Sequence, residues 1–130
     1  MPNNSENFTL INKTKSKLPS LSFVNIKDEI LGEKYELSLG IIDSKKIHKL
    51  NKQYRNVDSP TDILSFPLDK NFGEIFICPE ITKKKAVDFE RNYENYFSYL
   101  FIHGLVHLLG FDHGKKMDEK EKIYRRKFNI

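Results

Sequence analysis

The feature that most limits the possible folds is an apolar segment that ends at Gly110. A helix over 92–109 would carry apolar residues on almost every side, a pattern typical of a helix buried all round. Gly110 follows directly, and glycine lets the backbone leave a helix through a positive φ. The pattern therefore predicts a central helix with the rest of the chain packed around it. The apolar residues of its second half are Phe101, Ile102, Leu105, Val106, Leu108 and Leu109.

Three of the four histidines lie in this helix or just after it. His103 and His107 are four residues apart, so both imidazoles lie on one helix face and can reach a single ion. His113 follows the glycine and can approach the same point from another direction. Three nitrogen ligands suit tetrahedral zinc and leave the fourth position to water, as in catalytic sites. The spacing therefore predicts one zinc ion per chain, held by His103, His107 and His113.

The alternative is a pair of core histidines satisfied by hydrogen bonds, with a third on a loop. A bare His-x-x-x-His pair would favour that alternative, but His113 beyond the glycine, with Asp112 beside it, favours the metal. Asp112 is a candidate to hydrogen-bond and orient a ligand histidine. A turn residue at the helix exit explains Asp112 equally well. His48 stands apart, and no functional role is predicted for it.

The remaining periodicities predict short strands and helices in mixed order. Strands are expected over 8–11, 35–42, 62–68 and 74–81, and helices over 18–31, 44–54, 83–91, 92–109 and from 117 onward. The spacing of the third and fourth strands suggests an antiparallel hairpin. Mixed order of this kind predicts an α+β fold around a small sheet.

Composition narrows the class of protein. A length of 130 residues predicts a single domain over 1–130. Cys78 is the one cysteine, which excludes an internal disulfide and favours a reducing cytoplasm, with the residue itself in the core. Neither a signal peptide nor a membrane span is expected. The net charge of +4 permits an anionic partner such as nucleic acid without demanding one.

The segment 103–113, HGLVHLLGFDH, resembles the signature of the YbeY family, bacterial single-strand-specific endoribonucleases of ribosomal RNA maturation. Segments 51–55, 58–67 and 73–78 resemble further blocks of that family, in the same order. Two positions depart from its pattern. Glu74 stands where Asp is expected, and Phe111 stands where the family often has Tyr.

This resemblance implies a fold, a site and partners. The fold is a zincin-like α+β single domain, with a mixed sheet of about four strands packed around the metal-binding helix. His103, His107 and His113 are the implied zinc ligands, and Arg55 is placed to engage an RNA phosphate. The implied role is cleavage in rRNA maturation, notably at the 3′ end of 16S rRNA, and in ribosome quality control. Ribosomal RNA is the expected partner, with ribosomal proteins or a ribosome-associated GTPase as further candidates and no membrane.

A mechanism follows from these residues as a hypothesis. Zinc would activate a water or an RNA 2′-hydroxyl group, and Arg55 would help to neutralise the phosphate charge, so Arg55, His103 and His107 are the expected catalytic residues. Lys115 and Lys116, directly after the third ligand, are the expected RNA-binding lysines.

The alternatives are a zinc peptidase-like hydrolase and a non-catalytic RNA or ribosome adaptor with structural zinc. Gly104 stands where His-Glu-x-x-His proteases carry their general base, which counts against a peptidase. The missing side chain is also expected to leave room beside the metal for a polynucleotide.

Overall fold

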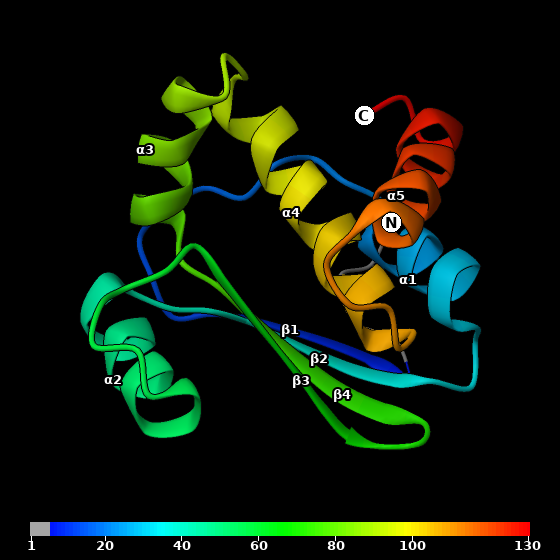
Figure 1. The fold of residues 1–130 in the computed structure, drawn as a ribbon, viewed down its shortest axis with the longest axis horizontal. Coiled ribbons are helices and arrows are strands. Elements are labelled where there is room, and N and C mark those ends of the chain that lie inside the picture. Colours follow the sequence, from blue (N-terminus) through cyan, green and yellow to red (C-terminus); the bar gives the residue numbers. More distant parts are fainter. Residues whose placement is uncertain (1–5) are drawn as a thin grey trace.

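Four strands form one mixed sheet in the computed structural model, which describes residues 6–130 (Figure 1). The strands are β1 (Phe8–Asn12), β2 (Glu36–Ile41), β3 (Ile63–Asp69) and β4 (Phe72–Ile77). Their order is β1-β2-β4-β3, so β1 and β3 are the two edges. β1 pairs with β2 and β2 with β4 in parallel, and β3 is antiparallel to β4. The predicted α+β class, four-stranded mixed sheet and antiparallel hairpin are confirmed.

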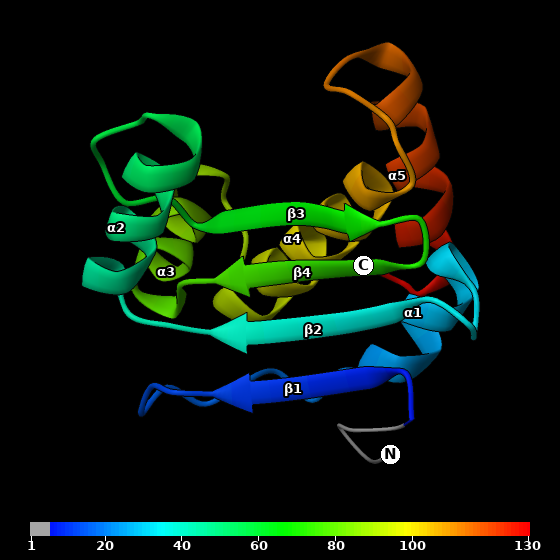
Figure 2. The ribbon, with the colours of Figure 1, turned by 90° about the horizontal axis from the view of Figure 1, so that it is seen from below.

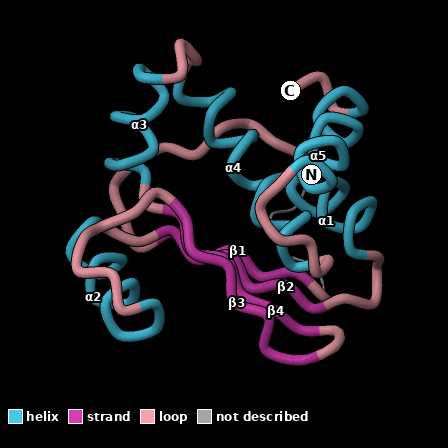
Figure 3. Tube along the Cα trace, in the orientation of Figure 1, coloured by secondary structure: helices cyan, strands magenta, loops and turns pink. Residues whose placement is uncertain are grey.

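Five helices of the described residues surround this sheet. They are α1 (Phe23–Leu31), α2 (Ser44–Arg55), α3 (Pro79–Asp88), α4 (Tyr93–Leu108) and α5 (Lys115–Lys127). α1, α4 and α5 lie on one side of the sheet, and α2 lies at one end of the strands (Figures 1 and 3). Figure 2, turned by 90°, shows α4 crossing behind the strands, with α2 and α5 at opposite ends of the molecule.

α4 is the central helix that the apolar pattern predicts. Ten of its sixteen residues are buried. Phe101 and Val106 lie in one apolar core with Leu37, Leu39 and Ile41, the alternate residues of β2 that point toward the helices. The neighbouring β2 residues point to the other face and are less buried. The period of two along β2 and the all-round apolar character of α4 therefore have one cause, which is the contact between sheet and helix.

The opposite face of the sheet is covered in part by α2. Ile47 of α2 packs with Leu64 of β3 and with Cys78, all of them buried. Cys78 is fully inaccessible, which confirms its expected place in the core. This second contact fixes α2, and with it the last residue of that helix, Arg55, relative to β3.

Several element boundaries differ from the sequence prediction. α1 begins at Phe23 rather than at residue 18, and Pro19 explains why Leu18 itself is not helical, because proline disfavours helical backbone in the residue before it. β4 ends at Ile77 and α3 begins at Pro79, because proline is well placed in a first helical turn and donates no ladder bond. α5 begins at Lys115, two residues earlier than expected.

The prediction of one domain over 1–130 stays a prediction, and residues 1–5 lie outside the described part of the chain. Within residues 6–130, no helix has the length and apolar character needed to cross a membrane.

Candidate active site

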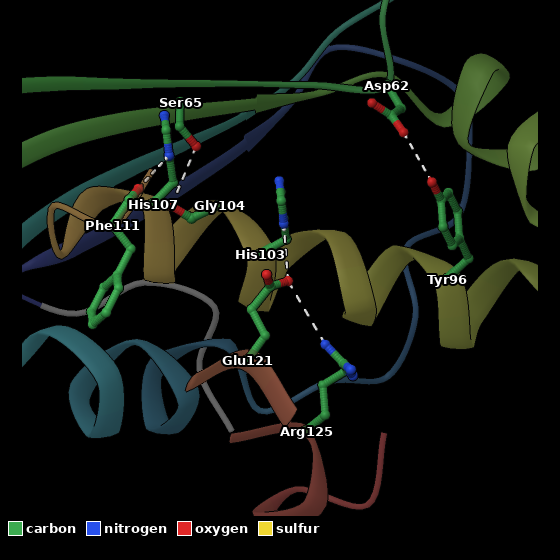
Figure 4. A network of polar contacts seen from close by, with 9 residues as sticks. All are labelled: Asp62, Ser65, Tyr96, His103, Gly104, His107, Phe111, Glu121 and Arg125. Atoms are coloured by element: carbon green, nitrogen blue, oxygen red, sulfur yellow. Dashed lines mark hydrogen bonds and ion pairs between the residues drawn. The ribbon is translucent and has the colours of Figure 1, made fainter. Parts of the chain in front are cut away.

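Two histidines project from the last turns of α4 toward β3 (Figure 4). His103 and His107 are half-buried, and α4 ends at Leu108. Gly110 then takes a φ of 106°, which allows the sharp exit that the sequence predicts. His113 lies on the following loop, and its ring centroid is 5.2 Å from that of His103 and 5.7 Å from that of His107. The structure thus brings the three predicted histidines together.

The hydrogen bonds of His103 and His107 fix which ring nitrogen carries the proton. His107 Nδ1 lies 3.0 Å from the backbone oxygen of Phe111, an atom that can only accept. His103 Nδ1 lies 2.9 Å from Oε1 of Glu121. Both rings therefore carry their hydrogen on Nδ1, and in the neutral form each leaves Nε2 free as a ligand atom. Because the contact at residue 111 uses the backbone, Phe in place of Tyr does not disturb it.

Glu121 reaches His103 from α5 and is a site residue that sequence reasoning missed. Its side chain is 2% exposed, and Arg125 Nη1 lies 3.7 Å from the same Oε1 atom. Met117 and Glu121, one turn apart, are the buried residues of α5. That spacing was the available signal, since Met117 marks the inward face and places Glu121 on it.

A cavity of about 320 Å³ joins the histidines to residues from α2 and β3. Arg55, the last residue of α2, lines it, and so does Ser65 of β3. Arg55 is exposed, so its guanidinium is open to a ligand. The complete lining is Arg55, Thr61, Asp62, Ile63, Ser65, His103, His107 and His113. The predicted arginine and the three predicted histidines therefore share one cavity.

Asp62 is a buried carboxylate in this cavity and a second site residue that sequence reasoning missed. Tyr96 donates from its hydroxyl to Asp62 Oδ2 at 3.2 Å, and Lys85 Nζ lies 3.5 Å from the same atom. Burial, followed by the Asp62 carboxylate, raises the pKa of Tyr96 far above its ordinary value of 10.0. Tyr96 therefore keeps its proton and holds Asp62 in place, as Figure 4 shows.

The ring nitrogens suit a metal, but in this structure the His113 ring is not oriented as a ligand would be. Among residues 6–130, no group of three or more His, Cys, Asp or Glu side chains is arranged so that it could hold a metal ion. The His113 ring lies at 26° to each of the other two rings, so the three stack instead of converging as tetrahedral ligands do. Two Nε2 atoms with oriented rings fit zinc chemistry, and His113, exposed on a loop, is the ring that would have to rotate.

The other predicted site residues lie beside the cavity. Asp112, Lys115 and Lys116 line a separate hollow that shares His113 with the main cavity. All three are exposed. Within the described part of the chain, the ring hydrogen bonds of His103 and His107 go to Glu121 and Phe111, and the orienting role of Asp112 stays a prediction.

The absence of a side chain at Gly104 allows α4 to pack closely against the sheet. A Cβ atom built there would lie 2.9 Å from Ile63 Cδ1, 3.0 Å from Ile75 Cδ1 and 3.0 Å from Ser65 Oγ. Ser65 also donates to the Gly104 backbone oxygen at 3.3 Å (Figure 4). The expected room for a substrate beside Gly104 is therefore wrong, because side chains of the sheet fill that space.

Comparisons with known proteins agree on one family. The family model described as "Endoribonuclease YbeY" matches residues 3–130. A protein named Endoribonuclease YbeY from Aliarcobacter butzleri is 39% identical over 110 residues, which cover 80% of this chain and 77% of that protein. Another of that name from Finegoldia magna is 34% identical over 131 residues, covering 95% and 84%. The solution structure of TM1509 from Thermotoga maritima matches with a TM-score of 0.62 and 31% identity, over 90% of this chain and 85% of that one.

Proposed function

The chain belongs to the YbeY family of endoribonucleases, and from this premise we propose that it is a zinc-dependent nuclease that cuts single-stranded RNA. The observation that carries the proposal is the shared cavity. Arg55 of α2 and the histidines of α4 and its following loop line one space of about 320 Å³, although Arg55 and His103 are 48 positions apart in the sequence. A cation beside three ring nitrogens is an arrangement that suits a phosphodiester.

His103 and His107 are the two fixed ligands, each holding Nε2 toward the cavity. Glu121 and the Phe111 backbone oxygen keep these rings in the ligand tautomer. His113 is the third ligand, and rotation of its ring would complete the set of three. What zinc supplies when bound is Lewis acidity toward the phosphodiester and toward the attacking water or 2′-hydroxyl group.

Arg55 binds the scissile phosphate and offsets the charge that develops on its oxygens. Its planar guanidinium can donate two parallel hydrogen bonds to a phosphate. The position of Arg55 supports this role, since its side chain is exposed and lines the same cavity as the histidines. Asn56 follows it in a left-handed conformation, with φ 57° and ψ 33°, and ends α2 there. The helix end therefore sets the direction from which Arg55 enters the cavity.

The substrate that we propose is ribosomal RNA, including the 3′ end of 16S rRNA, in maturation and quality control of the ribosome. Support comes from the family and from the net charge of +4, which favours association with a polyanion. Lys115 and Lys116, in the first turn of α5 beside His113, are proposed to contact the RNA backbone. Ribosomal proteins or a ribosome-associated GTPase are the proposed partners, and the cytoplasm is the proposed compartment.

A zinc peptidase is less well supported. The position of its general base is Gly104, whose Cα packs against the sheet. The two buried carboxylates near the histidines already have partners, Tyr96 and Lys85 for Asp62 and His103 for Glu121. A non-catalytic adaptor would need a fourth protein ligand that closes the zinc site.

The test is cleavage of a single-stranded ribosomal RNA fragment by the purified protein, with zinc content measured on the same samples. His107→Ala and Arg55→Ala are compared with His48→Ala, a histidine variant outside the cavity. We expect zinc-dependent cleavage by the wild type and by His48→Ala. We expect its loss in His107→Ala together with the metal, and a large reduction in Arg55→Ala with zinc retained.

Two results would count against the proposal. Equal cleavage by wild type and His107→Ala would show that the activity belongs to a contaminant. The second is a wild type that carries zinc, leaves RNA intact and has no exchangeable water at the metal. That result would favour a non-catalytic adaptor over a nuclease.

A further inference from the structure

Two arginines pack on the ring of one tyrosine of α4, Tyr99. The guanidinium carbon of Arg91 lies 4.8 Å from the centroid of the Tyr99 ring, and that of Arg125 lies 4.7 Å from it. Arg91 lies between α3 and α4, Tyr99 on α4 and Arg125 on α5. Cation–π contact favours keeping each guanidinium near the ring and limits its rotamers. We call these three residues the Tyr99 cluster.

The positive charge of this cluster is incompletely neutralised within the described part of the chain. Arg91 donates to the side-chain oxygen of Asn95, a neutral group. Arg125 has Glu121 at 3.7 Å, but that carboxylate also accepts from His103 at the shorter distance of 2.9 Å. Two like charges on one ring repel each other, so an anion bound between or beside them would be favoured.

The cluster lies about one helical turn from the histidines of the cavity along α4. Tyr99 precedes His103 by four residues, which is about one helical turn and places both on one helix face. Arg125 follows Glu121 by one turn of α5, and Glu121 contacts His103 (Figure 4). Arg55 lines the cavity from the end of α2, and the Tyr99 cluster adds two more cationic groups about one helical turn from His103.

We propose that the Tyr99 cluster binds a backbone phosphate of the RNA strand, next to the phosphate held at Arg55 and the histidines. This inference rests on the proposed function, since it assigns a second contact to the same substrate. Guanidiniums already fixed by stacking lose little freedom when they donate to phosphate oxygens. Arg91 is half-buried and the Arg125 side chain is 14% exposed, so both keep accessible surface near the α4 face. An RNA strand that spans both positions would gain affinity from each.

The test compares Arg91→Ala with Arg126→Ala, which removes the same charge from an exposed position next to Arg125. Two substrates are used, a long single-stranded RNA and a dinucleotide with a single phosphodiester. For the long RNA, we expect Arg91→Ala to raise KM roughly tenfold with kcat unchanged, because it removes binding that is equal in ground and transition states. The dinucleotide, which cannot reach both positions, should show no change. The slope of log affinity for the long RNA against log salt concentration should become shallower by the amount expected for about one phosphate contact.

Thermal unfolding of each variant is measured beside the kinetics. If Arg91→Ala does not fold, affinity for the long RNA is measured on Arg91→Lys, which keeps the charge but loses the planar fork. A severalfold loss there supports the proposal. Affinity equal to that of the wild type, or equal effects of Arg91→Ala and Arg126→Ala, overturns it. Failure of the wild type to act on either RNA would instead contradict the proposed function, so the two failures are distinguishable.

Discussion

Glu121 and His103 are 18 residues apart in the chain, and Oε1 of one lies 2.9 Å from Nδ1 of the other. The contact joins α5 to α4 at the histidine that begins the predicted metal motif. Since the carboxylate is 2% exposed, water offers little competition for this hydrogen bond. The last helix therefore takes part in orienting His103, the proposed zinc ligand.

Glu121→Gln should weaken zinc binding about 10- to 100-fold, the usual cost of losing a partner that orients a ligand histidine. The amide keeps the shape of the side chain but removes its negative charge. Competition with a chromophoric chelator measures the affinity without any assay of RNA cleavage. Glu119→Gln, at an exposed position of the same helix, is the matched control and should bind zinc as the wild type does. Equal affinities in all three proteins would show that the Glu121 contact has no effect on the ligand.

Gly104→Ala should destabilise the fold by about 1–3 kcal/mol, because the new methyl group would overpack a filled space. The nearest atoms, on Ile63 and Ile75, belong to buried or half-buried side chains of the sheet. Urea unfolding measures the loss. Lys84→Ala, on an exposed face of α3, should lie within about 0.5 kcal/mol of the wild type. An unfolding midpoint unchanged by Gly104→Ala would show that the sheet can move away at little cost.

Cys78 should be unreactive toward thiol reagents in the folded protein. It is inaccessible to solvent, and burial raises the pKa of its thiol above the ordinary value of 9.0. Folding therefore favours the neutral thiol. The resulting contribution to stability is fully present below pH 9.0 and is lost as the pH rises above that value. Alkylation rates measured against pH, with and without denaturant, test this. Native protein labelled as fast as unfolded protein would contradict it, and Cys78→Ala gives the background.

Asn56→Gly should leave stability nearly unchanged, whereas Asn56→Ala should lose about 1 kcal/mol. The reason is the left-handed backbone of Asn56, with φ 57°, which ordinary side chains adopt at a cost. Its N–H also bonds to the backbone oxygens of Asn51 and Lys52 at the end of α2. Thermal unfolding of the two variants checks the order. The same loss in both would mean that the asparagine side chain, and not its backbone, holds this helix end.

The parts predicted from the sequence are those fixed by local spacing. The apolar pattern of α4, the four-residue step from His103 to His107 and the alternation along β2 each reflect geometry within one element. Glu121 was not predicted as a site residue because α5 is rich in charged residues. Only the packing of α5 against α4 shows which of its carboxylates points inward. Gly104 was misread for a similar reason. Its neighbours come from β3 and β4, and no local pattern gives the distance between helix and sheet.

The position of β1 and β3 at the borders of the sheet has a consequence for association between molecules. Unpaired backbone groups on a border strand invite another strand to add, which is a common route to aggregation. β1 has only five residues, which limits the ladder that it can offer. β3 contains Pro67, which has no N–H to donate, and its register shifts between Pro67 and Asp69. Both edge strands are therefore poorly suited to pair with a strand of another molecule, and this protects the sheet against growth by strand addition.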